Sequence, residues 1–160
     1  MTKSAVLSND RYFRYSLSRT WDTSLPEFVV IGLNPSTADE NQDDPTIRRC
    51  ITFAKREKCG SLIMVNLFAF RSTSPEILKG TYKTTEVDRE NSKALAAHCL
   101  SPKSIVVAAW GNHGTYLNEN LRLLKNLSDW SIKVYCFGKT KSGNPKHPLY
   151  LPLDCPLEEL

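Results

Sequence analysis

Three polar side chains in this sequence stand where an apolar run gives way to a loop. Asn34 follows the run at 28–33, Asn66 lies near the end of the run at 62–67, and His147 lies in the closing loop at 144–148. A side-chain amide both donates and accepts hydrogen bonds, so Asn66 can bind a group that presents a donor beside an acceptor. The amide of Asn34 cannot act as a general base and can only orient a water molecule. These residues are the candidates for a binding site.

Each candidate also has a purely structural interpretation. Asn34, within Gly-Leu-Asn-Pro, is typical of an Asx-type turn that ends a strand. Asn66, in an apolar run, is consistent with a buried amide that bonds a neighbouring loop. Trp110 fits a core position as well as a base-stacking one, and His147 fits an idle surface position. The sequence leaves both interpretations open.

Four short apolar runs, at 28–33, 62–67, 104–110 and 132–137, predict buried strands. Helical periodicity occupies 45–58, 85–100 and 113–127, and Asp44 and Pro45 are typical of an N-cap and a first helical position. Residues 12–21 predict an edge strand or hairpin. Strands alternating with helices predict a three-layer α/β/α sandwich around a central four-stranded parallel sheet. The carboxyl ends of such strands share one edge, where open α/β sheets bind their ligands.

Length and composition predict one domain over residues 1–160, with 41% apolar residues for a single core. The five cysteines are odd in number and form no Cys-x-x-Cys pair, so we expect reduced thiols, no metal site and no cofactor. No apolar run approaches the roughly 18 residues of a membrane span, and the first residues lack a signal-peptide core. We therefore expect a cytoplasmic protein with no membrane partner.

Basic residues gather at two places. Arg48 stands one turn into the helix that begins at Asp44 and Pro45, and Lys139, Lys141 and Lys146 lie in the loop after the last run. With a net charge of +4 and a pI of about 8.8, the chain permits a polyanionic partner. Arg48 and the three lysines are candidate phosphate contacts in a nucleic acid, and a solvated connection is the alternative for the lysine loop.

The four strand ends carry Gly-Leu-Asn-Pro at 32–35, Asn66, Ala-Trp-Gly at 109–111 and His-Pro at 147–148. In this order they resemble the motifs of the uracil-DNA glycosylase superfamily, whose mismatch-specific branch has Gly-Leu-Asn-Pro. The resemblance spans residues 26–152. The stretches Arg-Tyr-x-Leu-x-Arg-x-Trp at 14–21 and Asp-Pro-Thr-Ile-Arg-Arg at 44–49 also resemble a small bacterial and phage family of the domain-of-unknown-function type, which brings no assigned activity.

The glycosylase resemblance implies roles for individual residues. His147 would donate to the departing base and Asn34 would position water beneath the sugar, so these two are the catalytic candidates. The residues that would bind the substrate are Gly32, Leu33, Pro35, Ser36, Asn66, Phe68 and Trp110. The implied partner is a nucleic acid or nucleotide.

Departures from the superfamily shape the functional hypothesis. The uracil-specific branch has a catalytic Asp where this chain has Asn34, so hydrolysis by that route should be slow. It has a tyrosine where this chain has Ser36, so a bulkier or 5-substituted base should be admitted. We therefore expect a nucleobase-acting enzyme for a modified or mismatched pyrimidine in DNA or a nucleotide. The alternatives are a non-catalytic nucleic-acid or nucleotide-binding module and a transferase that modifies 5-hydroxymethyl pyrimidines.

Overall fold

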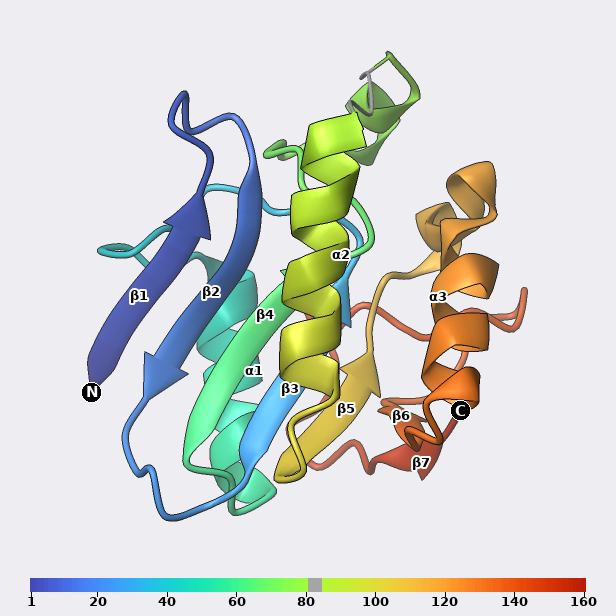
Figure 1. The fold of residues 1–160 in the computed structure, drawn as a ribbon. Coiled ribbons are helices and arrows are strands. Elements are labelled where there is room, and N and C mark those ends of the chain that lie inside the picture. Colours follow the sequence, from blue (N-terminus) through green and yellow to red (C-terminus); the bar gives the residue numbers. More distant parts are fainter. Residues whose placement is uncertain (81–84) are drawn as a thin grey trace.

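The computed structural model describes residues 1–80 and 85–160, and within them the strands form one mixed sheet. The sheet has seven strands in the order β1-β2-β4-β3-β5-β6-β7 (Figure 1). The strands are β1 (Thr2–Leu7), β2 (Arg14–Thr20), β3 (Glu27–Gly32), β4 (Ser61–Asn66), β5 (Ser104–Ala108), β6 (Val134–Cys136) and β7 (Glu158–Glu159). The helices are α1 (Pro45–Arg56), α2 (Thr85–Cys99) and α3 (Glu119–Asp129), with 3-10 helices η1 (Pro75–Gly80) and η2 (Asn112–Asn118).

The predicted four-stranded parallel sheet in a three-layer sandwich is wrong. The pairs β3–β4, β3–β5 and β5–β6 are parallel, but β1–β2, β2–β4 and β6–β7 are antiparallel. The segment predicted as an edge element is β2, an interior strand that pairs with both β1 and β4. The prediction missed β1 and β7 because both are largely exposed, and only β1 carries apolar residues, in the short stretch 5–7.

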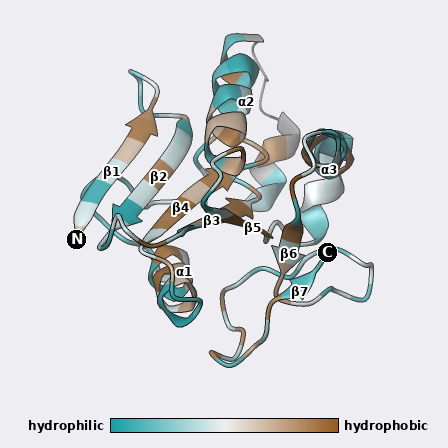
Figure 2. Ribbon diagram, turned by 60° about the horizontal axis from the view of Figure 1, so that its bottom comes forward, coloured by the Kyte–Doolittle hydropathy of each residue, from teal (hydrophilic) through white to brown (hydrophobic). Residues whose placement is uncertain are grey.

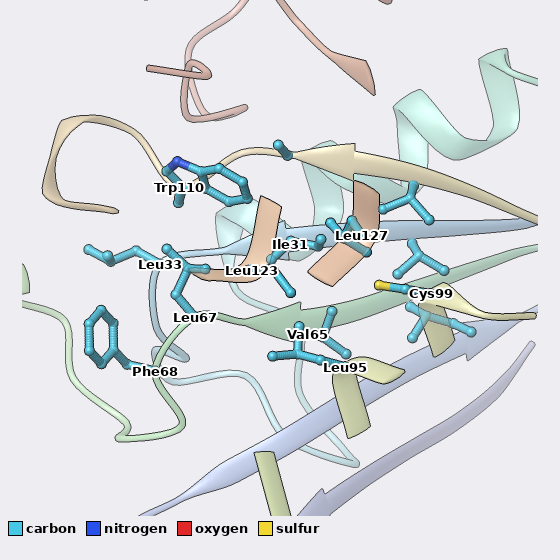
Figure 3. Packing of buried hydrophobic residues seen from close by; sticks show 14 of the residues in the cluster. Ile31, Leu33, Val65, Leu67, Phe68, Leu95, Cys99, Trp110, Leu123 and Leu127 are labelled. Atoms are coloured by element: carbon cyan, nitrogen blue, oxygen red, sulfur yellow. The ribbon is translucent and has the colours of Figure 1, made fainter. Parts of the chain in front are cut away.

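Alternation along the central strands sends side chains to opposite faces of the sheet, as period-two geometry requires. Phe28 and Val30 pack with α1, whereas Val29 and Ile31 pack with α2 and α3. Figure 2 shows α1 on one side of the sheet and α2 and α3 on the other, with the most hydrophobic segments in the central strands. Figure 3 shows the second of these clusters, in which Ile31 and Val65 lie among the leucines of α2 and α3.

The start of α1 is confirmed as predicted. Asp44 is the N-cap, its carboxylate accepts a hydrogen bond from the Ile47 N–H at 2.9 Å, and Pro45 occupies the first turn. The helix predicted over 113–127 is wrong in its first part. Tyr116 and Leu117 have non-helical dihedral angles, so the segment divides into η2 and α3. The positive φ of 53° at Leu117 breaks the helical hydrogen-bonding path.

The cysteines form no disulfide among the described residues. All five cysteines are free, and burial raises the pKa of the Cys50 and Cys99 thiols to about 12, so these thiols stay protonated near neutral pH.

Of the helices in residues 1–80 and 85–160, none combines the length and the apolar composition of a membrane span.

Candidate functional site

A cavity of about 650 Å³ opens at the carboxyl ends of β3, β4 and β5, a volume in the range of small-molecule sites. It also borders the N-terminus of α1 and the loop after β6. Most residues predicted for the site line this cavity: Gly32, Leu33, Asn34, Ser36, Asn66, Trp110 and His147. Residues separated by more than one hundred positions in the chain therefore meet at one place.

Asn66 ends β4 and presents its amide to this cavity. Its side chain is buried, with 1% exposed, and neither Nδ2 nor Oδ1 has a hydrogen-bond partner among the described residues. The backbone carbonyl of Asn66 accepts a hydrogen bond from Asn91 Nδ2 at 3.0 Å, which fixes the strand end against α2. An unsatisfied buried amide costs about 1–3 kcal/mol. A ligand that filled both of its hydrogen-bonding positions would remove this penalty.

Gly32 makes room for the Asn66 amide. The two residues are partners in the parallel register of β3 and β4. A Cβ atom at position 32 would lie 2.8 Å from Asn66 Oδ1, closer than real Cβ atoms approach such an atom. A side chain at position 32 would therefore displace the Asn66 amide from its present position.

Trp110 follows β5 and belongs both to the core and to the cavity wall. Its indole is 2% exposed, and within the described residues its Nε1–H has no acceptor. Figure 3 shows it at the same end of the core as Leu33 and Leu67. Gly114 supports the indole from behind, since a Cβ there would lie 2.1 Å from the Trp110 ring. The core position of Trp110 is thus confirmed, and base stacking stays a prediction.

Arg14 is a charged residue of the cavity wall that the sequence did not predict. Its side chain is 2% exposed and lines the cavity, where Nη1 donates to the Ala38 carbonyl at 2.7 Å. Nε has no partner in the part of the chain that the structure describes, and Arg14 forms no ion pair there. Burial lowers the pKa of Arg14 to about 10, an effect that the Asp44 carboxylate opposes.

A β-bulge places Arg14 at the cavity. The register between β1 and β2 passes from Val6 with Ser16 to Leu7 with Arg14, so Tyr15 is an extra residue. An extra residue shifts the alternation of side chains between the two faces of the sheet by one position. Arg14 can therefore lie on the same face as Leu17, which packs with the buried residues of α1. A single extra residue in β2 thereby places a guanidinium at the cavity.

The loop between β3 and α1 forms one wall, and four arginines donate to its backbone carbonyls. One of them is Arg48, whose Nη1 donates to the Asp43 carbonyl at 2.6 Å. Arg71 donates to the carbonyls of Ser36 and Thr37 at 3.3 and 3.1 Å. Arg19, whose side chain is fully buried, donates to the carbonyls of Asp39 and Gln42 at 2.5 and 3.2 Å and pairs with the carboxylate of Asp43 at 2.6 Å. Arg14 completes the set through its contact with Ala38.

Asn34 divides its amide between structure and cavity. Nδ2 donates to the carbonyls of Pro35, Phe70 and Ser72 at 3.1, 3.3 and 3.0 Å, so it ties the strand end to the loop after β4. Among the described residues no group donates to Oδ1, which is left as an acceptor at the cavity. Asn34 thus has a structural role at the end of β3 through Nδ2. Its Oδ1 can still accept a hydrogen bond from a water molecule.

His147 lies at the mouth of the cavity. Its Nδ1 accepts a hydrogen bond from the Leu149 N–H at 3.2 Å, which assigns the proton of the neutral imidazole to Nε2. The side chain still reaches solvent, yet the surrounding protein lowers its pKa by desolvation, and the Asp44 carboxylate partly offsets this. A neutral imidazole with an Nε2–H donor follows.

The other predicted residues lie outside the cavity wall. Pro35 is buried, and Phe68 packs in the core with its ring centroid 5.7 Å from that of Tyr116. Arg48 borders a separate shallow surface depression with Arg49 and Tyr150. Lys139, Lys141 and Lys146 are exposed in the hairpin that follows β6.

Comparison with known proteins places the chain in a family. A family model described as "Protein of unknown function (DUF1643)" matches residues 14–149. The chain belongs to this family, which confirms the predicted resemblance to the domain-of-unknown-function type. No curated protein and no solved structure matches the chain. The matched range begins at Arg14 and ends at Leu149, and both of these residues line the cavity.

Proposed function

We propose that this protein binds a pyrimidine nucleobase in the cavity and acts on it in the manner of a uracil-DNA glycosylase. The observation that carries the proposal is the buried Asn66 amide, whose donor and acceptor both lack a partner in the described residues while the side chain lines the cavity. A pyrimidine edge presents a complementary acceptor beside a donor. Binding would satisfy both amide positions at once.

The groups around Asn66 support a reaction at the base or its sugar bond. His147 offers an Nε2–H that would stabilise negative charge on a departing base. Asn34 Oδ1 is free to orient a water molecule. Ser36 also lines the cavity, and its side chain is small at the position where the glycosylase resemblance would place a 5-substituent. The preferred substrate is therefore a 5-substituted or mismatched pyrimidine in DNA or a nucleotide.

A binding and turnover series on uracil, thymine and 5-hydroxymethyluracil, supplied as nucleosides and in oligonucleotides, tests this proposal. We expect the 5-substituted bases to be preferred, and Asn66→Ala to weaken binding of all three about 10- to 100-fold, as the loss of two buried hydrogen bonds implies. Ser36→Tyr should reduce binding of thymine and 5-hydroxymethyluracil more than that of uracil.

Asn126→Ala is the matched control, because Asn126 lies on α3 and outside this cavity. It should bind all three bases as the unchanged protein does. Preference for plain uracil, or equal binding by Asn66→Ala and Asn126→Ala, would contradict the proposal.

A non-catalytic binding module is the second candidate function. It is favoured because no carboxylate among the described residues of the cavity wall is left to act as a general base. Asp44 is the one carboxylate among the described residues that line the cavity, and it is engaged as the α1 N-cap. Mass analysis of the nucleic acid after incubation separates the candidates. Release of free base indicates a glycosylase, and a retained base of changed mass indicates a transferase acting on 5-hydroxymethyl pyrimidines. An unchanged substrate that remains bound indicates a binding module.

A further inference from the structure

Arg14 carries a buried positive charge for which the described protein provides no contacting counter-ion. The side chain is 2% exposed, and within the described residues its guanidinium donates one hydrogen bond, to the Ala38 backbone carbonyl. A buried charge is strongly unfavourable unless it is paired. Arg14 lies in the wall of a cavity, so the missing partner can come from a ligand.

The first turn of α1 meets the same cavity. Pro45, Thr46 and Ile47 line it together with Arg14. The first N–H groups of a helix have no acceptor within the helix, and the helix dipole favours negative charge at this end. The Asp44 carboxylate binds one of them, the Ile47 N–H, which leaves the Thr46 N–H in the cavity wall.

The charged groups near Arg14 leave an excess of positive charge. Asp43 is paired with Arg19, and Asp39 lies 3.7 Å from Arg11, so these two carboxylates have cationic partners of their own. Arg71 adds a further positive charge near Arg14, and Asp44 contributes the opposing one. A cavity wall with this balance favours an anion over a neutral group.

We propose that Arg14 and the first turn of α1 bind the phosphate monoester of a free pyrimidine nucleotide. This inference rests on the proposed nucleobase function, because it assigns the phosphate of the molecule whose base Asn66 binds. A phosphodiester within a strand continues on both sides of the phosphorus and has to remain at the surface. A terminal monoester continues on one side, so it can enter the cavity far enough to reach a buried arginine.

The first experiment uses inorganic phosphate as the probe and thermal unfolding as the measurement. Phosphate should raise the Tm of the unchanged protein relative to sodium chloride at the same ionic strength, because a ligand that binds the folded state stabilises it. Arg14→Gln should abolish the increase. Arg89→Gln is the control with the same charge change, since Arg89 lies on α2 with 63% of its side chain exposed. It should keep the full increase.

The second experiment compares thymidine, thymidine 5′-monophosphate and a thymidine oligonucleotide without terminal phosphates by calorimetric titration. The monophosphate should bind about 10- to 100-fold more tightly than the nucleoside, as charged hydrogen bonds imply. Arg14→Gln should remove this advantage and leave the nucleoside affinity unchanged. Arg14→Lys, which keeps the charge and loses the planar fork, should keep part of the advantage and serves if Arg14→Gln does not fold.

The outcomes separate this inference from the proposed function. Equal affinity for nucleoside and monophosphate, or tighter binding of the oligonucleotide, would overturn the phosphate assignment and leave the nucleobase function standing. A phosphate-dependent Tm that Arg14→Gln abolishes, without nucleoside binding that depends on Asn66, would instead retain the anion site and overturn the nucleobase function.

Discussion

Arg14 and Arg19 lie on the same strand, β2, and both are buried, but their surroundings differ. Arg19 pairs with the Asp43 carboxylate and donates to several backbone carbonyls. Arg14 donates to one carbonyl and forms no ion pair within the described residues. The strand thus holds one arginine that the protein satisfies and one that it does not, and the second lines the cavity.

The same contrast recurs with other residue types. Trp21 donates its indole N–H to the Cys59 carbonyl at 3.0 Å, whereas the Trp110 N–H has no described acceptor. Asn91 donates to two backbone carbonyls through Nδ2 and leaves only Oδ1 without a described partner, whereas both amide atoms of Asn66 are unpaired in the described chain. Of the seven buried side-chain atoms without a partner there, four belong to Arg14, Asn66 and Trp110. Buried polar groups are normally bonded, so their gathering at one cavity points to a ligand.

The largest expected effect separates the two arginines. Arg19→Met should lower the free energy of unfolding by about 3–5 kcal/mol, because it leaves Asp43 without its buried partner. Arg14→Met should change it by less than about 1 kcal/mol, because removing an unpaired buried charge offsets the loss of one hydrogen bond. Urea denaturation of the ligand-free variants measures both. Equal losses would show that Arg14 is as much a structural residue as Arg19.

The two buried asparagines should respond with opposite signs. Asn91→Leu should lower the free energy of unfolding by about 2 kcal/mol, since the Asn66 and Leu67 carbonyls lose their donor. Asn66→Leu should raise it by about 1 kcal/mol in the absence of ligand, because it replaces an unsatisfied amide with an apolar side chain of similar volume. Denaturation in urea is again the measurement, and a loss in Asn66→Leu would contradict the contrast.

The two tryptophans should differ by a smaller amount. Trp21→Phe and Trp110→Phe both lose indole packing, but only the first loses a hydrogen bond present in the folded protein. After the loss of packing at each site is subtracted, we expect Trp21→Phe to lower the free energy of unfolding by about 1 kcal/mol more than Trp110→Phe does. This difference is the contribution of one hydrogen bond. Intrinsic fluorescence during denaturation reports both transitions, with Trp130→Phe on the surface as the control. A greater loss of stability in Trp110→Phe after the same subtraction would show that the Trp110 N–H forms a hydrogen bond in the folded protein.

The smallest effect is a pH dependence at the cavity mouth. The pKa of His147 in the folded protein is below the 6.5 of an ordinary histidine, so the unfolded chain binds a proton first as pH falls. The stability contribution is present above pH 6.5 and is lost as the pH falls through the lowered folded value. Tm measured from pH 7 to about 5 should fall less in His147→Gln than in the unchanged protein.

His98 is the comparison residue, since desolvation lowers its pKa as well and it lies on α2, away from the cavity. His98→Gln should also flatten the Tm profile but should leave the pH dependence of ligand binding unchanged. A profile that His147→Gln does not alter would show that protonation of His147 is not coupled to folding.

Part of the candidate site was predictable because it depends on neighbouring strands with strong apolar patterns. Asn34 and Asn66 each follow or end such a strand, and Gly32 pairs with Asn66 in the observed register. Arg14 was not predictable. Its place in the cavity depends on the antiparallel pairing of β2 with β4 and on the bulge at Tyr15, and neither feature has a sequence signal that periodicity can detect.

The fold prediction failed at the edges of the sheet for a related reason. Apolar runs identify strands that are buried on both faces, whereas β1 is mostly exposed and β7 contains two glutamates. Phe68 is a further example at the level of one residue. The glycosylase resemblance implied that it binds the substrate, and the structure places its ring in the core beside Tyr116.

The arginine-held loop at 36–43 has a consequence for how the folded protein meets proteases. A polar loop without helix or strand is usually cut first, because its backbone can extend into a protease active site. Here guanidinium groups from Arg14, Arg19 and Arg71 occupy its carbonyls, so that extension requires several contacts to break together. The segment that composition marks as the most vulnerable should therefore survive limited digestion, and the cavity wall that it forms should be in place before any ligand arrives.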